Sequence, residues 1–276
     1  ECSYGELEAR RRRGEAEERA LGGHWMWGQG RRRQLAGPAA DAWPVLIGEA
    51  TRDTMDQLTR PLCPRWIGRQ LREVAPFIEQ DGPFTAAQLQ TMLEQREWRE
   101  GFLAERMQDE ILLEQILVET EGEQIGQINA LSVVEFPGHP RAFGEPSRIS
   151  CVVHTGDGEF TDIERKAELG GNIHAKGMMI MQAFLMAELE LDQQLPFSAS
   201  LTFEQSYGEV DGDSASMAEL CALISAPAGS PTYPQIALTG SVAQLARSQP
   251  VAGRHVNIHG SFTTRHHLGL PGDQGV

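Results

Sequence analysis

The strongest constraint on the fold is a change in hydrophobic spacing near Gly122. Between Thr85 and Glu119, apolar residues recur mostly three and four positions apart, with glutamate and arginine at many of the other positions. This spacing predicts amphipathic helix, either a helical hairpin or a connector. After Gly122, short alternating or β-branched segments typical of strands are separated by two helical patterns. The change predicts an α+β fold behind a helical segment.

The expected strands are Gly126–Val134, Arg148–His154, Ser198–Phe203 and Gln235–Thr239. The expected helices run from about His174 to Leu191 and from about Asp213 to Pro227. Residues 1–36 carry two arginine runs with no apolar period, and residues 37–85 show no repeat. We therefore leave residues 1–85 unassigned and interpret them as a remnant or a disordered segment.

Composition excludes several functional classes. The formal net charge of −15 argues against a nucleic-acid-binding surface. No apolar run approaches the ~20 residues that a membrane-spanning helix needs, and the first residues lack the apolar core of a signal peptide. The four cysteines form no C-x-x-C pair, which suits a reducing compartment. Together these features predict a soluble, cytoplasmic protein.

The densest cluster of polar and small residues is Phe203–Ser216, between an expected strand and an expected helix. A serine at a helix start lies near unpaired backbone N–H groups, which it can cap or which can stabilise a developing oxyanion. From the spacing alone, Asp-Gly-Asp-Ser before an apolar run favours an ordinary N-cap. The absence of a G-x-S-x-G sequence argues against an α/β-hydrolase.

Neither a metal nor a nucleotide is expected in this chain. His255 and His259 are four residues apart, but no H-E-x-x-H glutamate accompanies them, and Gly253 and Gly260 argue against a helix that would hold them together. They are interpreted as loop or surface histidines. The sequence has no G-x-x-x-x-G-K-[ST] loop, so it should not hydrolyse ATP by itself.

Several segments resemble the proteolytic domain of Lon-type ATP-dependent proteases, in particular the B-type and Lon-like bacterial branch. They are Glu119–Val133, Gly144–Ile149, Asp162–Leu169, Ile173–Gly177 and Phe203–Leu220. The match covers roughly residues 98–253. It implies a Lon-type proteolytic domain with the ribosomal protein S5 domain 2-like fold over 123–276, behind a connector over 86–122 that resembles the lid of the ATPase region.

The resemblance also implies the activity and the partners. The implied activity is that of an ATP-dependent serine endopeptidase. The implied partners are unfolded or damaged protein substrates and further copies of the chain, which assemble into a hexameric ring. ATP is implied for the full-length family only.

In this family a serine and a lysine form the catalytic dyad. By resemblance, Ser214 is the nucleophile, Asp211 is an acidic residue near it, and Thr239 is the threonine that helps to orient the lysine. Gln249–Gly253 keeps the family register, which puts Asn257 at the lysine position. An amide cannot accept the serine proton, so the dyad is broken.

The chain has only two lysines, Lys166 and Lys176, and both belong to other segments of the family pattern. Residues 254–267 read unlike the family, and the chain stops where the family would begin another strand and helix, which predicts a domain incomplete at its C-terminus. A local frame change in the coding sequence is one hypothesis for the unfamiliar stretch. His255 or His259 could also replace the missing base.

We therefore expect an impaired Lon-like serine endopeptidase. One alternative is a non-catalytic pseudo-protease or ring-assembly module. Another is an acidic protein that binds metal through its C-terminal histidines.

Overall fold

The structure is a computed structural model that describes residues 10–12, 22–23, 35–61, 63–78, 82–188, 197–245 and 247–270. The chain divides into two compact units, Glu1–Gly101 and Phe102–Val276. The division lies inside the segment that the sequence pattern treats as one connector over 86–122. Each unit has its own hydrophobic core.

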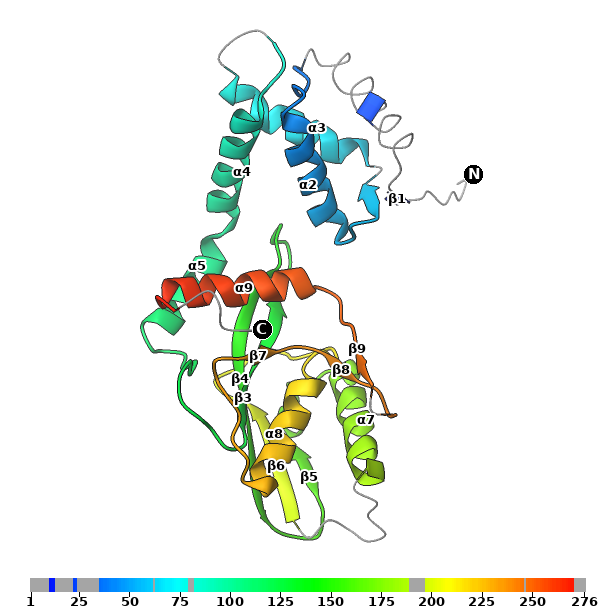
Figure 1. Cartoon of the computed structure of the whole chain (residues 1–276), viewed down its shortest axis with the longest axis vertical. Coiled ribbons are helices and arrows are strands. Elements are labelled where there is room, and N and C mark those ends of the chain that lie inside the picture. The colour runs from blue at the N-terminus through cyan, green and yellow to red at the C-terminus, as the bar shows by residue number, and fades with distance from the viewer. Residues whose placement is uncertain are drawn as a thin grey trace. The chain divides into compact units, whose positions relative to one another are not determined.

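The first unit is mainly helical. Its described elements are β1 (Arg10–Arg12), α2 (Ala42–Thr54), β2 (Thr59–Pro61), α3 (Pro64–Val74), the short 3-10 helix η1 (Ala75–Phe77) and α4 (Ala86–Glu100). β1 and β2 pair in antiparallel fashion. The core contains Leu46 of α2, Leu71 of α3 and Met92 of α4, together with Phe84. Much of 37–85, which the sequence pattern leaves unassigned, is therefore part of a packed helical unit (Figure 1).

α4 begins as the helical period predicts. Thr85 is its N-cap, and Thr85 and Gln88 form a capping box in which each side chain accepts from the other residue's backbone N–H. The helical path is interrupted at Gly101 and resumes as α5 (Phe102–Leu112). Residues 113–119 are not helical, and Glu114 has a φ of 57°, which no α-helix accommodates. The helical period thus extended about seven residues beyond the observed helix.

The second unit is built on a five-stranded mixed sheet in the order β5-β6-β4-β3-β7. The strands are β3 (Gln127–Val134), β4 (Phe143–Thr155), β5 (Phe160–Asp162), β6 (Phe197–Phe203) and β7 (Ala237–Leu238). The pairs β3–β4 and β4–β6 are antiparallel, whereas β3–β7 and β5–β6 are parallel. A separate small ribbon joins β8 (Ser241–Val242) and β9 (Ser248–Gln249). The four predicted strands are all present, with β4 longer and β7 shorter than expected.

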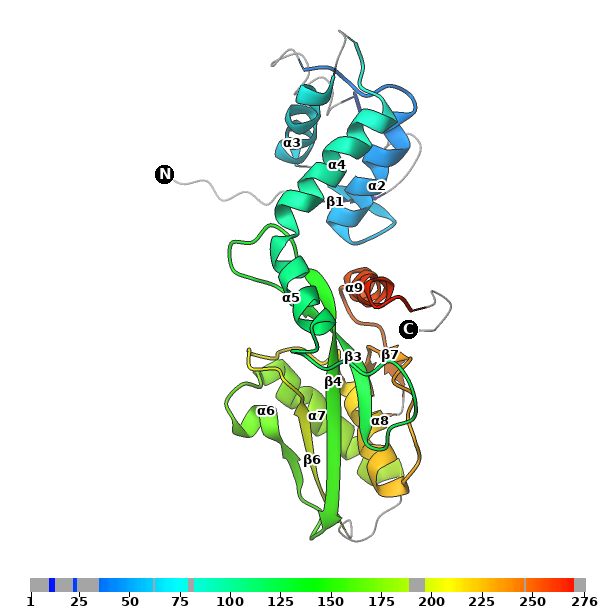
Figure 2. The same cartoon turned by 90° about the vertical axis from the view of Figure 1, so that its left-hand side faces the viewer.

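The helices of this unit are α6 (Ile163–Lys166), α7 (Asn172–Glu188), α8 (Ser216–Ala228) and α9 (Arg254–His267). The two predicted helices correspond to α7 and α8, which run beside each other in both views (Figures 1 and 2). The core lies between these helices and the sheet and includes Ile149, Met181, Leu201 and Leu223. Mixed strands and helices confirm the α+β class.

α9 corrects the expectation for the histidine-rich segment. Gly253, with a φ of 71°, precedes the helix as its N-cap rather than breaking it. Gly260 lies inside the helix, where a Cβ would overlap backbone atoms of Gly144 on β4. The glycine that argues against a helix from sequence alone is thus the residue that lets this helix approach the sheet.

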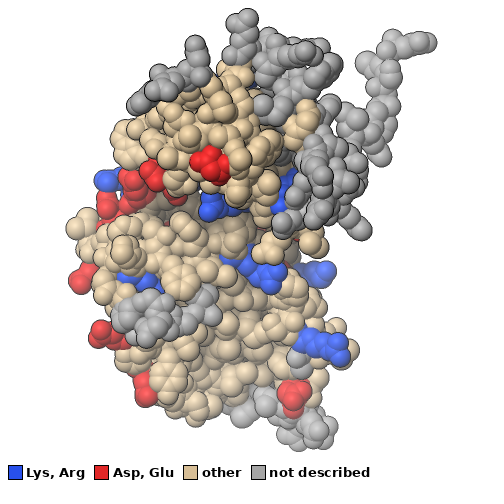
Figure 3. All heavy atoms as spheres, turned by 45° about the horizontal axis from the view of Figure 1, so that its top comes forward, with Lys and Arg blue, Asp and Glu red and all other residues tan. Residues whose placement is uncertain are grey.

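None of the described helices is long and apolar enough to cross a membrane. On the face shown in Figure 3, basic and acidic side chains lie in small separate groups, and most of the visible described surface is neither.

Candidate functional site

Ser214 lies in the turn between β6 and α8 and is half-buried. Its carbonyl oxygen accepts a hydrogen bond from the backbone N–H of Gly240 at 2.7 Å and from the Thr239 hydroxyl at 3.4 Å. Thr239 and Gly240 follow β7, so the serine turn is tied to the segment that leaves this edge strand. Ser214 and Thr239, which are 25 residues apart in the sequence, are thus in contact through the Ser214 backbone carbonyl.

Asn257 completes this group from α9. Its side chain is 1% exposed, and its Nδ2 donates to the Thr239 hydroxyl at 3.5 Å. Its Oδ1 has no hydrogen-bond partner within the part of the chain that the structure describes. A buried carbonyl oxygen without a donor is costly, so an amide is poorly matched to this position. Ser214, Thr239 and Asn257 therefore form one connected group.

The place of Asn257 is set by the backbone of α9. A Cβ on Gly144 would overlap the Val256 carbonyl and crowd the Asn257 Cα, so only a glycine on β4 allows this approach. Position 257 consequently faces the protein, whereas His255 and His259 are exposed. At about 100° per residue, position 257 lies some 200° around the helix from both histidines.

Asp211 is not in this group. It is exposed, and its Oδ1 accepts from the backbone N–H groups of Ile173 at 3.0 Å and His174 at 3.2 Å. The backbone N–H of Gly212, then those of His174 and Ile173, hold the pKa of Asp211 below its ordinary value. Asp211 lies in the loop 204–215 between β6 and α8, here called the serine loop, and it thus caps the N-terminus of α7.

Asp213, Ser216 and Ser241 also support the serine turn, and the sequence pattern assigned them no such role. The Ser241 hydroxyl donates to Asp213 Oδ2 at 2.8 Å, and the Ser216 hydroxyl donates to the Asp213 carbonyl at 2.8 Å. The N-cap of α8 is Ala215, with no side-chain cap. The expected Asp-Gly-Asp-Ser capping of this helix is therefore wrong, because Asp211 caps α7 and Asp213 accepts from Ser241 of β8 instead.

Neither lysine reaches this group. Lys166 donates to Glu159 and Thr161 at 3.3 Å each, and Lys176 is exposed on α7. In the described part of the chain, no cluster of three or more His, Cys, Asp or Glu side chains could hold a metal ion.

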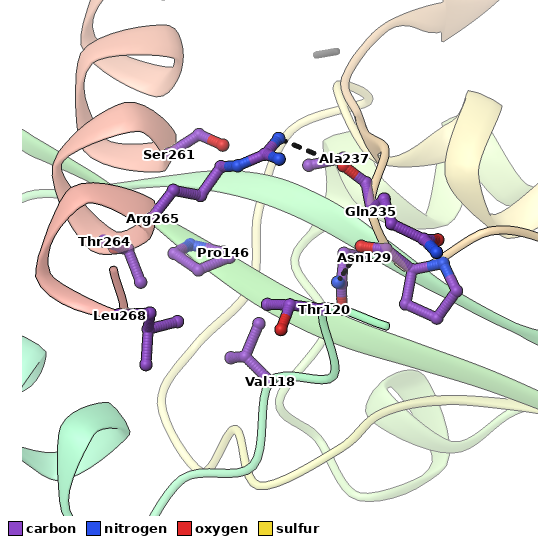
Figure 4. Close-up of a pocket in the computed structure, with 11 residues that line it drawn as sticks. Val118, Thr120, Asn129, Pro146, Gln235, Ala237, Ser261, Thr264, Arg265 and Leu268 are labelled. Carbon is purple, nitrogen blue, oxygen red and sulfur yellow. Dashed lines mark hydrogen bonds between the residues drawn. The ribbon is translucent and has the colours of Figure 1, made fainter. Parts of the chain in front are cut away.

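One hollow of about 340 Å³, including space open to solvent, lies beside α9. Figure 4 shows its lining, with Arg265 donating to the Gln235 carbonyl and Asn129 donating to the Pro234 carbonyl. Neither Ser214 nor Asn257 lines it. The hollow is therefore separate from the serine group, and no step of the chemistry is assigned to it.

Two curated proteins are similar to this chain. A protein of Escherichia coli strain K12 is 70% identical over 252 residues, which are 91% of this chain and 43% of that protein. A protein of Haemophilus influenzae is 53% identical over 206 residues, which are 75% of this chain and 34% of that protein. Both bear the name "Putative Lon protease homolog". The chain thus spans less than half the length of either relative. No family model matches it.

Proposed function

The chain belongs to a Lon-like family, and on that premise we propose that its second unit is a Lon-type proteolytic domain in which Ser214 is the nucleophile. The proposal includes a broken dyad, because Asn257 stands where the general base would be. The observation that carries it is the connected group of Ser214, Thr239 and Asn257.

The chemistry of the position explains the impairment. For peptide hydrolysis, the Ser214 oxygen would add to the substrate carbonyl while its proton passes to a base, and the amine would leave with a proton to give an acyl-enzyme that water hydrolyses. Asn257 offers two N–H donors and an amide oxygen that is not a base at neutral pH. A lysine in the same buried place would have its pKa lowered by desolvation and could take the proton.

Backbone N–H groups at the start of α8 would stabilise the oxyanion. Two of them are already used, because Ser216 donates to the Asp213 carbonyl at 3.2 Å and Met217 donates to the Gly240 carbonyl at 3.1 Å. Among the described residues, the N–H groups of Ser214 and Ala215 have no backbone acceptor. We assign the oxyanion site to these two donors.

We extend the proposal to the partners that the family implies. The substrate would be an unfolded or damaged protein, and copies of the chain would assemble into a hexameric ring in the cytoplasm. Coupling to ATP would need a Walker A loop, which these 276 residues lack, so no ATP hydrolysis is proposed for them. Sedimentation of the purified chain would measure the assembly directly.

The test restores the base. Asn257→Lys should hydrolyse casein or a fluorogenic peptide at least about a hundredfold faster than the parent chain, the range of a positioned general base. Asn257→Met is the matched control, because it adds length without a proton acceptor. The activity of Asn257→Lys should disappear in Asn257→Lys/Ser214→Ala.

Two outcomes would overturn the proposal. The first is a folded Asn257→Lys chain with no more activity than Asn257→Met, which would support the non-catalytic interpretation. The second is cleavage by the parent chain that Ser214→Ala leaves unchanged.

A further inference from the structure

A second group of buried ionisable side chains lies close to the serine turn. His174 on α7 is 2% exposed, and its Nε2 lies 3.0 Å from Asp162 Oδ2 and 3.8 Å from Glu219 Oε1. Glu219 on α8 is also 2% exposed, and its Oε2 has no hydrogen-bond partner among the described residues. The two helices thus meet through an imidazole and a carboxyl group that water does not reach.

The groups around this contact are mostly acidic. Glu164 on α6 is buried, and its Oε1 accepts from the Phe203 backbone N–H at 2.8 Å and from the Thr202 hydroxyl at 2.9 Å. Asp211 approaches from the serine loop, where it accepts the His174 backbone N–H. The Phe203 ring of β6 packs edgewise on the imidazole, with centroids 5.9 Å apart. Within the described residues, no lysine or arginine pairs with these carboxylates, which leaves His174 as their cation.

The excess of carboxyl groups over basic side chains here, together with burial, shifts the pKa of each group. Burial raises the pKa of Glu219 to about 7, and the charges of Asp162 and Glu164 act in the same direction against that of His174. Burial lowers the pKa of His174, but its hydrogen bond to Asp162 and the charges of Glu219, Asp162 and Glu164 outweigh this, so the net shift is upward. Burial raises the pKa of Asp162, but the hydrogen bond and charge of His174 bring it below its ordinary value.

The same helix pair supports the serine turn one helical turn further along. Gly177 of α7 follows His174 by three residues and lies against the start of α8. A Cβ at Gly177 would lie 2.7 Å from the Ser216 hydroxyl and 3.2 Å from the Asp213 Cβ. Since Glu219 is five residues after Ser214 on the same segment, a shift of α7 against α8 at His174 would also move the turn that carries Ser214.

We propose that His174 and Glu219 are positioning residues whose buried contact fixes α7 against α8 and so holds the Ser214 turn in place. The catalytic meaning of this role rests on the proposed function, whereas the contact itself does not. A displacement of about 1 Å at a reacting group can lower a rate about a hundredfold. A small shift at the contact between α7 and α8 would therefore slow hydrolysis.

The direction of the pH dependence follows from the shifts. Glu219 has a folded-state pKa above its ordinary value of 4.5, so the stability it contributes is fully present below pH 4.5 and is lost as the pH rises to about 7. His174 acts in the same direction, with its contribution lost as the pH rises above its ordinary value of 6.5 through its raised pKa. Asp162 acts in the opposite direction and loses its contribution only in acid, below its ordinary value of 3.8. The contact between α7 and α8 should therefore weaken as Glu219 ionises beside Asp162 and Glu164.

The test compares Glu219→Gln with Glu209→Gln, a matched change at an exposed carboxylate of the serine loop. In the full chain, the urea midpoint of the second unit should fall between about pH 5.5 and about pH 8.5, and Glu219→Gln should remove at least about half of that fall. Glu209→Gln should retain it. Equal pH profiles for the parent chain and Glu219→Gln would overturn the proposal, whatever the enzymatic outcome.

A second measurement tests the positioning role in the Asn257→Lys chain. There, Glu219→Gln should lower kcat about tenfold or more with KM changed less than about twofold, because the carboxamide keeps the shape of the side chain but not the carboxyl group that faces His174. An unchanged kcat beside an active Asn257→Lys parent would also overturn the proposal. If Asn257→Lys is itself inactive, the proposed function fails, and the urea profiles alone decide whether the contact is as described.

Discussion

At the scale of single residues, the sequence pattern assigns a position in the family register to Asn257 but does not predict its surroundings. The register of Gln249–Gly253 predicts that Asn257 stands in the lysine position, and this assignment stays a prediction. The structure adds that this residue is buried against Thr239 and that its Oδ1 lacks a partner. The burial of Asn257 and the missing hydrogen bond at its Oδ1 depend on tertiary neighbours such as Gly144. Residue spacing in the sequence does not reveal these neighbours.

Asp211 is the acidic residue that the resemblance implies near the nucleophile. Its carboxylate bonds to the first turn of α7. No local pattern could reveal this, because the partners lie 38 and 37 residues away.

We predict that Asp211 acts as a cap rather than as a charge in catalysis. Asp211→Ala should lower the thermal midpoint of the chain, because the N–H groups of Ile173 and His174 lose their acceptor. Asp211→Asn should restore most of that loss, since its side-chain oxygen can still accept. In the Asn257→Lys chain, Asp211→Asn should keep the hydrolysis rate. A rate lost with Asn while the thermal midpoint is kept would instead make the carboxylate charge functional.

At the scale of elements, the strands β3, β4, β6 and β7 and the helices α7 and α8 followed from residue pattern, because alternation and helical spacing are local signals. The short elements β5, β8, β9 and α6 were not predicted. α9 was not predicted either. Its sequence contains Gly260 and few apolar residues, so its helical state depends on packing against β4. Tertiary contact outweighed local propensity here.

We predict that α9 is sensitive to a single methyl group at Gly260. Gly260→Ala should destabilise the second unit by about 2 kcal/mol or more, because the added Cβ meets backbone of Gly144 that cannot move aside. Urea unfolding would measure this. Gly48→Ala is the control, since Gly48 lies in α2 with open space around it, and there alanine should be neutral or stabilise by up to about 1 kcal/mol. Equal effects at the two glycines would contradict the close approach of α9 and β4.

At the scale of the whole molecule, the sequence pattern predicted a change of architecture but not its boundary. The helical period runs from Thr85 to Glu119 without a composition change, whereas the division between the units falls after Gly101. Residues 37–85 also went unassigned, because the described helices α2, α3 and α4 share a core that only their packing reveals.

Two separate cores predict two separable unfolding events. Leu71→Ala and Leu223→Ala are a matched pair, since the two side chains are 1% and 0% exposed in the first and second cores. Each should cost about 2–5 kcal/mol in its own unit. By calorimetry, each variant should lower one transition and leave the other within error. A single transition shifted equally by both would show that the chain unfolds as one cooperative body.

The account depends most on the claim that Ser214 is a nucleophile that lacks its base. Covalent labelling by a serine-reactive fluorophosphonate, with the modified residue identified by mass spectrometry, tests this without a peptide substrate. Asn257→Lys should be labelled at Ser214 about a hundredfold faster than Asn257→Met or the parent chain. Equal labelling rates in the three folded proteins, or labelling at a different residue, would contradict it.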